Sequence, residues 1–99
     1  KFGVRAPMVG HLGDGNFHVV LPFDPAKKEM YKQIRAFNDS LIKKALELNG
    51  TITGEHGVGL HKKEYLLDEH PDNIPVMKSI KRTMDPNNIM NPGKIFDLN

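Results

Sequence analysis

The chain is expected to reverse its direction within His11-Leu12-Gly13-Asp14-Gly15-Asn16-Phe17-His18, a glycine-rich turn with a histidine at each end. Seven residues of extended chain span roughly 23 Å, whereas two imidazoles that share one metal ion bring their nitrogens within about 4 Å of each other. A shared metal ion therefore requires the chain to fold back here. Gly13 and Gly15 permit the reversal because glycine adopts positive φ without steric cost. Asp14 and Asn16 stabilise tight turns through hydrogen bonds between side chain and backbone.

A strand is predicted immediately after this turn. The segment from Phe17 to Phe23 is rich in β-branched and aromatic residues, which is typical of a strand. His18 and Val20 would share one face of it, because side chains alternate between the two faces along a strand.

A long amphipathic helix is predicted next. Asp24 and Pro25 are an N-cap residue followed by a proline at the first helical position, so the helix is expected to begin there. Asn49-Gly50 supplies the left-handed conformation that commonly ends a helix. The apolar residues between these signals recur at steps of three or four: Met30, Ile34, Phe37, Leu41, Ala45 and Leu48.

The remainder of the chain predicts shorter elements. Thr51-Ile52-Thr53 is expected to form a short strand, and a second helix is expected from about Asn73 to Met84. The segment from Asp85 to Lys94 is dense in turn-forming residues and should be an ordered but irregular tail. Together these elements predict an α+β fold in which a helix packs on an antiparallel or mixed sheet.

Composition limits the classes of function. The chain has 99 residues, enough for one small domain, and Lys1–Arg5 reads like mid-chain sequence entering a strand, so we expect a fragment of a larger protein. The formal net charge is +2, and the lysines are interleaved with acidic residues. This pattern does not indicate a basic patch that binds nucleic acid or a membrane surface. The absence of cysteine excludes disulfides and thiolate ligands. No apolar run is long enough to span a membrane.

His11, His18 and Glu55 are candidate metal ligands. Two imidazole nitrogens and a carboxylate oxygen form a donor set of borderline hardness that suits Zn, Mn, Fe or Co. The alternative is that one histidine caps the turn and the other is a half-buried strand residue, which is the commoner situation for an isolated pair of histidines. A phosphate-binding turn is not favoured, because a strand and not a helix N-terminus follows it.

His56 is the best candidate for a general base. It is adjacent to Glu55, and neighbours in a regular strand face opposite ways, so both reach one site only where the backbone is irregular. Gly54, Gly57 and Gly59 provide that irregularity. A cation nearby disfavours a protonated histidine and leaves it able to accept a proton. From spacing alone, it is equally plausible that Glu55 and His56 simply end a strand.

The other polar residues are assigned no firm role. Lys62 and Lys63 open a charged segment that resembles a solvated face, and Asp14 is a turn-builder that could also orient an imidazole. The remaining ones are expected at the surface or in turns: His61, His70, Asn91 and Lys94.

Three motifs in this order resemble the C-terminal part of the FAD-linked oxidases of the vanillyl-alcohol oxidase superfamily. They are His11–His18, Gly54-Glu55-His56-Gly57-Val58-Gly59 and Asp85-Pro86-Asn87-Asn88-Ile89-Met90-Asn91-Pro92-Gly93-Lys94. The nearest groups are the D-lactate dehydrogenases, the glycolate oxidase FAD subunits and the D-2-hydroxyglutarate dehydrogenases. The resemblance implies that residues 1–99 are the last part of a ferredoxin-like cap domain, and that the FAD-binding domain lies outside this chain.

The resemblance also implies a reaction. His11, His18 and Glu55 would bind a divalent metal, Zn, Mn or Fe, and His56 would take the proton of the substrate hydroxyl. Hydride would pass from C2 of a 2-hydroxy acid to FAD, giving the 2-oxo acid. Members of the family that act on dicarboxylates tend to have asparagine two residues after the second histidine. This sequence has Val20 there, which favours a smaller acid such as lactate or glycolate.

The resemblance further implies that Asn16 lines the substrate site and that Asn91 and Lys94 lie near the flavin. The fragment alone is expected to be inactive. The alternatives are a stand-alone metal-binding or structural module without redox activity, and a metal-dependent hydrolase. A small-molecule substrate is expected and nucleic acid is not. The electron acceptor and homo-oligomerisation stay open, and a cytoplasmic or peripheral membrane location is expected.

Overall fold

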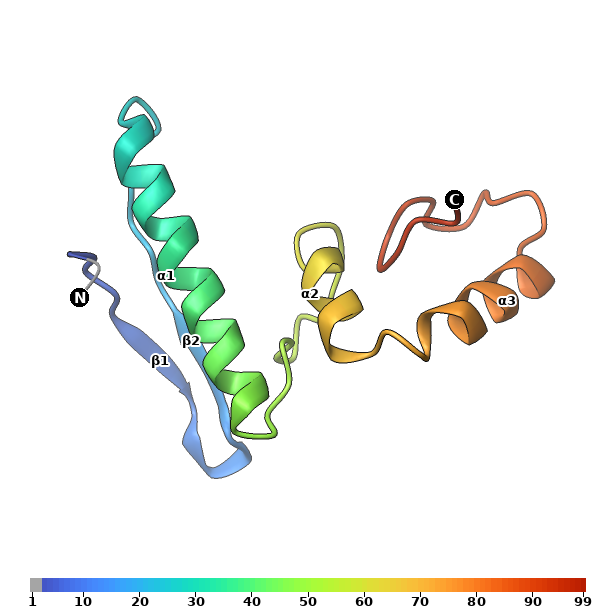
Figure 1. Cartoon of the computed structure of the whole chain (residues 1–99), viewed down its shortest axis with the longest axis horizontal. Helices are drawn as coiled ribbons and strands as arrows, with labels where there is room; N and C mark the ends of the chain where they lie inside the picture. The colour runs from blue at the N-terminus through green and yellow to red at the C-terminus, as the bar shows by residue number, and fades with distance from the viewer. Residues whose placement is uncertain (1–2) are drawn as a thin grey trace. The chain divides into compact units, whose positions relative to one another are not determined.

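The computed structural model describes residues 3–99, which divide into two compact units, residues 3–55 and His56–Asn99 (Figure 1). The first contains two strands and a long helix, and the second contains two shorter helices and an irregular tail. The fold is α+β, as the sequence predicts. No helix within the described residues has the length and apolar character needed to cross a membrane.

The first unit begins with a β-hairpin. Strands β1 (Met8–His11) and β2 (Asn16–Val19) pair antiparallel, and a short 3₁₀ helix, η1 (Leu12–Asp14), connects them. Gly15 closes the turn with a left-handed φ of 69°, and its N–H donates to the Leu12 carbonyl at 3.1 Å. This conformation is the one that glycine adopts most readily. The predicted reversal of the chain is therefore confirmed.

The second strand is shorter than predicted. The ladder ends with a hydrogen bond of 2.9 Å from the Val20 N–H to the Pro7 carbonyl, so the prediction of a strand as far as Phe23 is wrong. Pro22 has no N–H to donate, which limits further pairing. The expected strand at the start of the chain falls partly on Lys1 and Phe2, outside the described residues. Residues 3–7 are not in a strand.

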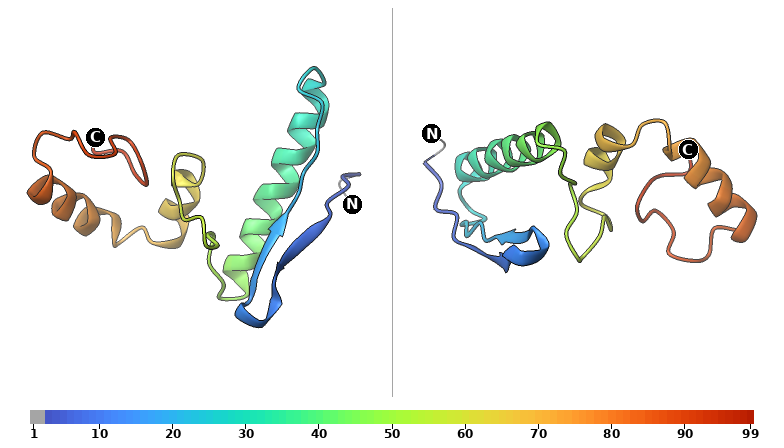
Figure 2. Two further views of the ribbon diagram at one scale, coloured as in Figure 1. Left: turned by 180° about the vertical axis from the view of Figure 1, so that it is seen from behind. Right: turned by 90° about the horizontal axis from the view of Figure 1, so that it is seen from below.

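Helix α1 (Lys28–Glu47) begins three residues later than predicted. Asp24 caps a turn instead of the helix, because its Oδ1 accepts the Ala26 N–H at 3.0 Å and its carbonyl accepts the Lys27 N–H at 2.9 Å. Lys27 has φ −100° and ψ 86°, outside the helical region, so the helix starts only after it. The helix runs alongside the hairpin, as both views in Figure 2 show.

The apolar face of α1 consists of the residues that the sequence periodicity predicts. Ile34 is buried and the apolar residues around it are half-buried: Met30, Phe37, Leu41 and Ala45. Leu48 follows the last helical residue and is exposed. The helix ends in a Schellman motif, in which Asn49 has φ 60° and the Gly50 N–H donates to the Ala45 carbonyl at 2.8 Å.

Thr51–Thr53 does not form the predicted strand. The only sheet within residues 3–99 is the two-stranded hairpin, and this segment does not join it. A strand is stabilised by its ladder of hydrogen bonds to a neighbouring strand. A local preference for extended backbone does not supply that neighbour. Ile52 is nevertheless buried, so the segment contributes to the core of the first unit as a loop.

The second unit contains one helix that the sequence predicts and one that it does not. Helix α3 (Ile74–Met84) matches the expected span, whereas α2 (Lys63–Glu69) occupies a segment that resembled a solvated charged run. Leu66 in α2 and Ile74 in α3 are the buried apolar residues here. Lys63 donates to the Gly93 carbonyl at 3.0 Å and to Asp97 Oδ1 at 2.8 Å, which ties the tail to α2.

Asp85 organises the start of the irregular tail. Its side chain is 5% exposed, and it accepts the Ile89 N–H at 3.0 Å, the Met90 N–H at 2.9 Å and the ammonium group of Lys81. The hydrogen bond from Lys81, followed by those from the two amides, holds the pKa of the Asp85 carboxyl below its usual value. The segment is ordered and irregular, as predicted, and the buried carboxylate explains its order.

The Asp85 carboxyl is predicted to titrate below the usual value of about 3.9 for aspartate. Replacing Lys81 with methionine should move this pKa upward, because it removes the hydrogen bond that favours the ionised form. Carboxyl ¹³C NMR titration measures both values. Lys44→Met, at an exposed lysine of α1, is the matched control and should leave the Asp85 pKa unchanged. An Asp85 pKa unaffected by Lys81→Met would contradict this account.

Candidate metal and acid–base site

One face of the hairpin carries three of the predicted site residues. The register places His11 opposite Asn16 and Val9 opposite His18. Residues directly opposite each other, and residues two apart on one strand, point to the same face. His11, Asn16 and His18 therefore share a face, which is the arrangement that the glycine-rich turn predicts.

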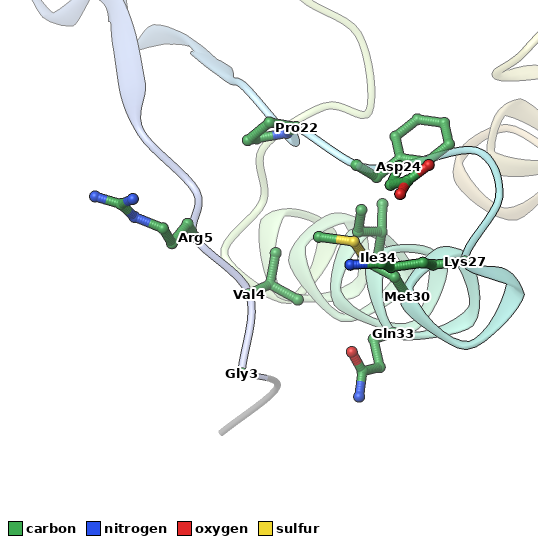
Figure 3. Close-up of a pocket in the computed structure, with 10 residues that line it drawn as sticks. Gly3, Val4, Arg5, Pro22, Asp24, Lys27, Met30, Gln33 and Ile34 are labelled. Carbon is green, nitrogen blue, oxygen red and sulfur yellow. The ribbon is translucent and has the colours of Figure 1, made fainter.

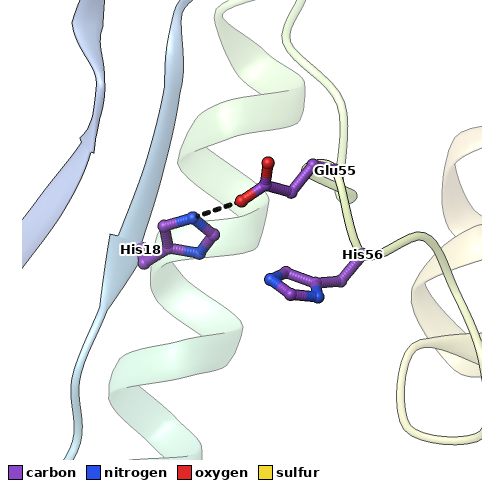
Figure 4. A group of neighbouring side chains, drawn as sticks. All are labelled: His18, Glu55 and His56. Atoms are coloured by element: carbon purple, nitrogen blue, oxygen red, sulfur yellow. Dashed lines mark hydrogen bonds and ion pairs between the residues drawn. The ribbon is translucent and has the colours of Figure 1, made fainter.

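His18 contacts Glu55. The imidazole Nε2 lies 3.0 Å from Glu55 Oε1, although 37 residues separate the two in sequence (Figure 4). The His18 side chain is 33% exposed and the Glu55 side chain 52% exposed, so the pair is open to solvent and to a ligand. The contact lies within the first unit, where the Asn49-Gly50 stop of α1 turns the chain back toward β2.

His56 follows Glu55 directly in the chain. Ligand atoms of His18, Glu55 and His56 all lie within 4.8 Å of one another, a spacing that one metal ion could bridge. The backbone here is irregular, as predicted, because Gly57 and Gly59 have positive φ of 72° and 55°. Two imidazoles and a carboxylate are the donor types that zinc and related divalent ions accept.

His11 is placed differently from the other candidate ligands. Within the described residues, the group of mutually close ligand atoms consists of His18, Glu55 and His56, without His11. His11 is exposed at the end of β1, one diagonal position from His18 on the same face. Diagonal neighbours lie about 7–8 Å apart, within reach of a long side chain that changes rotamer.

Asn16 lies on this face against the loop that carries Glu55. It is half-buried, and its side-chain amide packs directly on the backbone at Gly54. The sequence predicts Asn16 as a site residue and does not reveal this contact. Asp14 is exposed in η1, consistent with a turn-builder.

The other predicted residues belong to the second unit. Asn91 has φ 47° and its carbonyl accepts the Lys94 N–H at 3.3 Å, while Lys94 Nζ donates to the Pro92 carbonyl at 3.1 Å. Both side chains are exposed. His61 and His70 are exposed too, as expected. Sequence reasoning gave Lys63 and Asp85 no role. Their charged partners, the Asp97 carboxylate for Lys63 and the Lys81 ammonium group for Asp85, become evident only in the fold.

A cavity of about 600 Å³ lies elsewhere in the first unit, between the segment before β1 and the start of α1 (Figure 3). Its lining is largely apolar and includes Val4, Met30 and Ile34, together with the charged residues Arg5, Asp24 and Lys27. It contains neither a histidine nor any of the predicted ligands. The predicted ligands His11, His18 and Glu55 therefore lie outside this cavity.

Comparison with known proteins agrees with the motifs. Residues 1–95 match the family described as "FAD linked oxidases, C-terminal domain". The chain is 44% identical over 96 residues to a protein of Danio rerio named "Probable D-lactate dehydrogenase, mitochondrial", covering 96% of this chain and 19% of that protein.

Two bacterial proteins are similar. "Glycolate oxidase subunit GlcD" of Bacillus subtilis is 41% identical over 97% of this chain and 21% of its own length. "D-2-hydroxyglutarate dehydrogenase" of Stutzerimonas stutzeri is 42% identical over 88% of this chain and 19% of its own length. The chain thus spans about a fifth of the length of these relatives. It belongs to the family of C-terminal domains of FAD-linked oxidases.

Proposed function

We propose that this domain supplies the metal ligands and the proton acceptor of an FAD-dependent dehydrogenase that oxidises a 2-hydroxy acid to the 2-oxo acid. The observation that carries the proposal is the 3.0 Å contact between His18 and Glu55, with His56 next in the chain. The names of the relatives support the substrate class, because lactate, glycolate and 2-hydroxyglutarate are all 2-hydroxy acids.

The donor set fits a divalent metal. His18 and Glu55 already present a ring nitrogen and a carboxylate oxygen side by side, and His11 on the same face is the third ligand that we propose. Such nitrogen and oxygen donors suit Zn, Mn or Fe. When bound, a divalent ion supplies Lewis acidity that lowers the pKa of the substrate hydroxyl.

His56 is the group that accepts the hydroxyl proton. An unprotonated imidazole is a suitable general base near neutral pH, and the glycines after it leave its loop free of regular strand geometry. Asn16 offers a carboxamide on the same face as His18, able to hydrogen-bond the carboxylate or hydroxyl of the substrate. Together these two side chains orient the substrate and remove one proton.

FAD, when bound, would supply the hydride acceptor, and most of its site would lie outside residues 1–99. We propose that Asn91 and Lys94 lie beside it, because both offer N–H donors on an ordered turn that Asp85 and Lys63 hold in place.

We propose that the substrate is a small 2-hydroxy acid with one carboxylate. Val20 comes two residues after His18, on the same face of the chain, and is half exposed. An apolar side chain here offers no hydrogen bond to a second carboxylate, which would be left without a partner. Lactate or glycolate therefore fits better than a dicarboxylate.

Replacing His18 with alanine in the full-length protein should abolish metal binding. Removing a residue that only orients a ligand costs about 10- to 100-fold in metal affinity, so removal of a ligand should cost at least about 100-fold. Metal analysis after dialysis measures the bound ion. His70→Ala, which removes an exposed histidine of the second unit, should leave metal content unchanged. Equal metal content in His18→Ala and wild type would refute the ligand assignment.

Replacing His56 with glutamine should lower kcat by about 10²- to 10⁴-fold, the usual contribution of a general base, and leave metal content intact. Steady-state rates with D-lactate at saturating metal and flavin provide the test. A variant that keeps the wild-type kcat would exclude His56 as the base.

A further inference from the structure

Gly54 makes an unusually close approach to Asn16. A Cβ built at Gly54 would lie 2.5 Å from Asn16 Oδ1 and 3.5 Å from its Cγ, whereas real Cβ contacts below 3.0 Å are essentially never seen. The backbone of Gly54 itself is not left-handed, unlike that of Gly57 and Gly59. A side chain at position 54 would therefore displace the neighbouring amide, whereas the backbone conformation of Gly54 places no demand for glycine.

The atom that would have to move is the end of the Asn16 side chain. The Asn16 backbone is fixed in β2, where it pairs with His11, and a strand in a ladder resists displacement. The carboxamide, in contrast, can rotate about two side-chain bonds. A methyl group at position 54 should thus turn the Asn16 amide out of its place while the strand stays where it is.

The contact between His18 and Glu55 uses neither of these two residues. It joins the Nε2 of His18 to the Oε1 of Glu55, on side chains that a rotation of the Asn16 amide leaves in place. A substitution at Gly54 should therefore change the orientation of the Asn16 amide and leave metal binding at the same site unchanged.

We propose that Gly54 is a positioning residue, whose missing side chain leaves room for the Asn16 carboxamide to face the substrate. The inference rests on the proposed function, in which Asn16 binds the hydroxy acid. Gly54 would then set the affinity for a substrate that carries a carboxylate or hydroxyl acceptor, without touching the substrate itself.

The test is a double-mutant cycle in the full-length holoenzyme, with D-lactate as substrate. Asn16→Ala should raise KM about tenfold, the usual consequence of losing one hydrogen bond. Gly54→Ala should raise KM by a similar factor, and the double variant should resemble either single variant, because only one amide can be lost. Metal content should match wild type throughout. Gly13→Ala is the matched control, because a Cβ there meets nothing within 4 Å.

Each outcome bears on a different claim. A KM for Asn16→Ala equal to wild type removes Asn16 from the substrate site and overturns both this inference and that part of the proposed function. A raised KM for Asn16→Ala with an unchanged KM for Gly54→Ala, or with factors that multiply in the double variant, overturns the inference alone.

The double variant keeps the test informative even if Gly54→Ala alone does not fold. If Gly54→Ala fails to fold, the double variant should fold, since truncating Asn16 removes the atoms that the new methyl group would meet. Circular dichroism and flavin absorbance report folding of each variant. A double variant that also fails to fold would show that the need for glycine does not arise from Asn16.

Discussion

The antiparallel register of β1 and β2 is the constraint on which the site depends. Pairing Val9 with His18 and His11 with Asn16 puts the two histidines and the carboxamide on one face. A shift of one residue would send all of them to the opposite face, because side chains alternate along a strand. Gly15, in a left-handed turn, fixes this register, and the Schellman stop of α1 then returns the chain so that Glu55 meets His18.

Charge-assisted contacts, some of them to the buried carboxylate of Asp85, take the place of a large core in the second unit. The buried apolar residues of the described chain are few: Ile34, Ile52, Leu66 and Ile74. The tail after α3 is instead held by Asp85, which accepts hydrogen bonds from two backbone amides and an ammonium group. Lys63 also holds it, by donating to the Asp97 carboxylate and to a backbone carbonyl. Hydrogen bonds in which one partner is charged are stronger than neutral ones. An irregular segment can therefore be ordered without a large apolar core.

The sequence predicts the elements whose signals are local. The turn at Gly15, the periodic face of α1 and its end at Asn49, and the span of α3 are confirmed because glycine, periodicity and capping act over a few residues. The strand at Thr51–Thr53 and the extension of β2 to Phe23 are wrong because they require a partner strand, which local sequence does not specify. Of the predicted site, the contact of His18 with Glu55 agrees with their joint assignment as candidate ligands, although spacing alone left open that Glu55 simply ends a strand. The approach of Gly54 to Asn16 emerges only from the fold.

We infer that the hairpin face and the loop at Glu55 form one metal site. Anomalous diffraction from crystals of the full-length protein, collected on either side of the manganese or zinc absorption edge, shows where a metal ion binds. An anomalous peak is expected within about 2.0–2.3 Å of His18 Nε2 and a Glu55 carboxylate oxygen, in place of their direct hydrogen bond. A metal bound elsewhere, with His18 and Glu55 still bonded to each other, would contradict it.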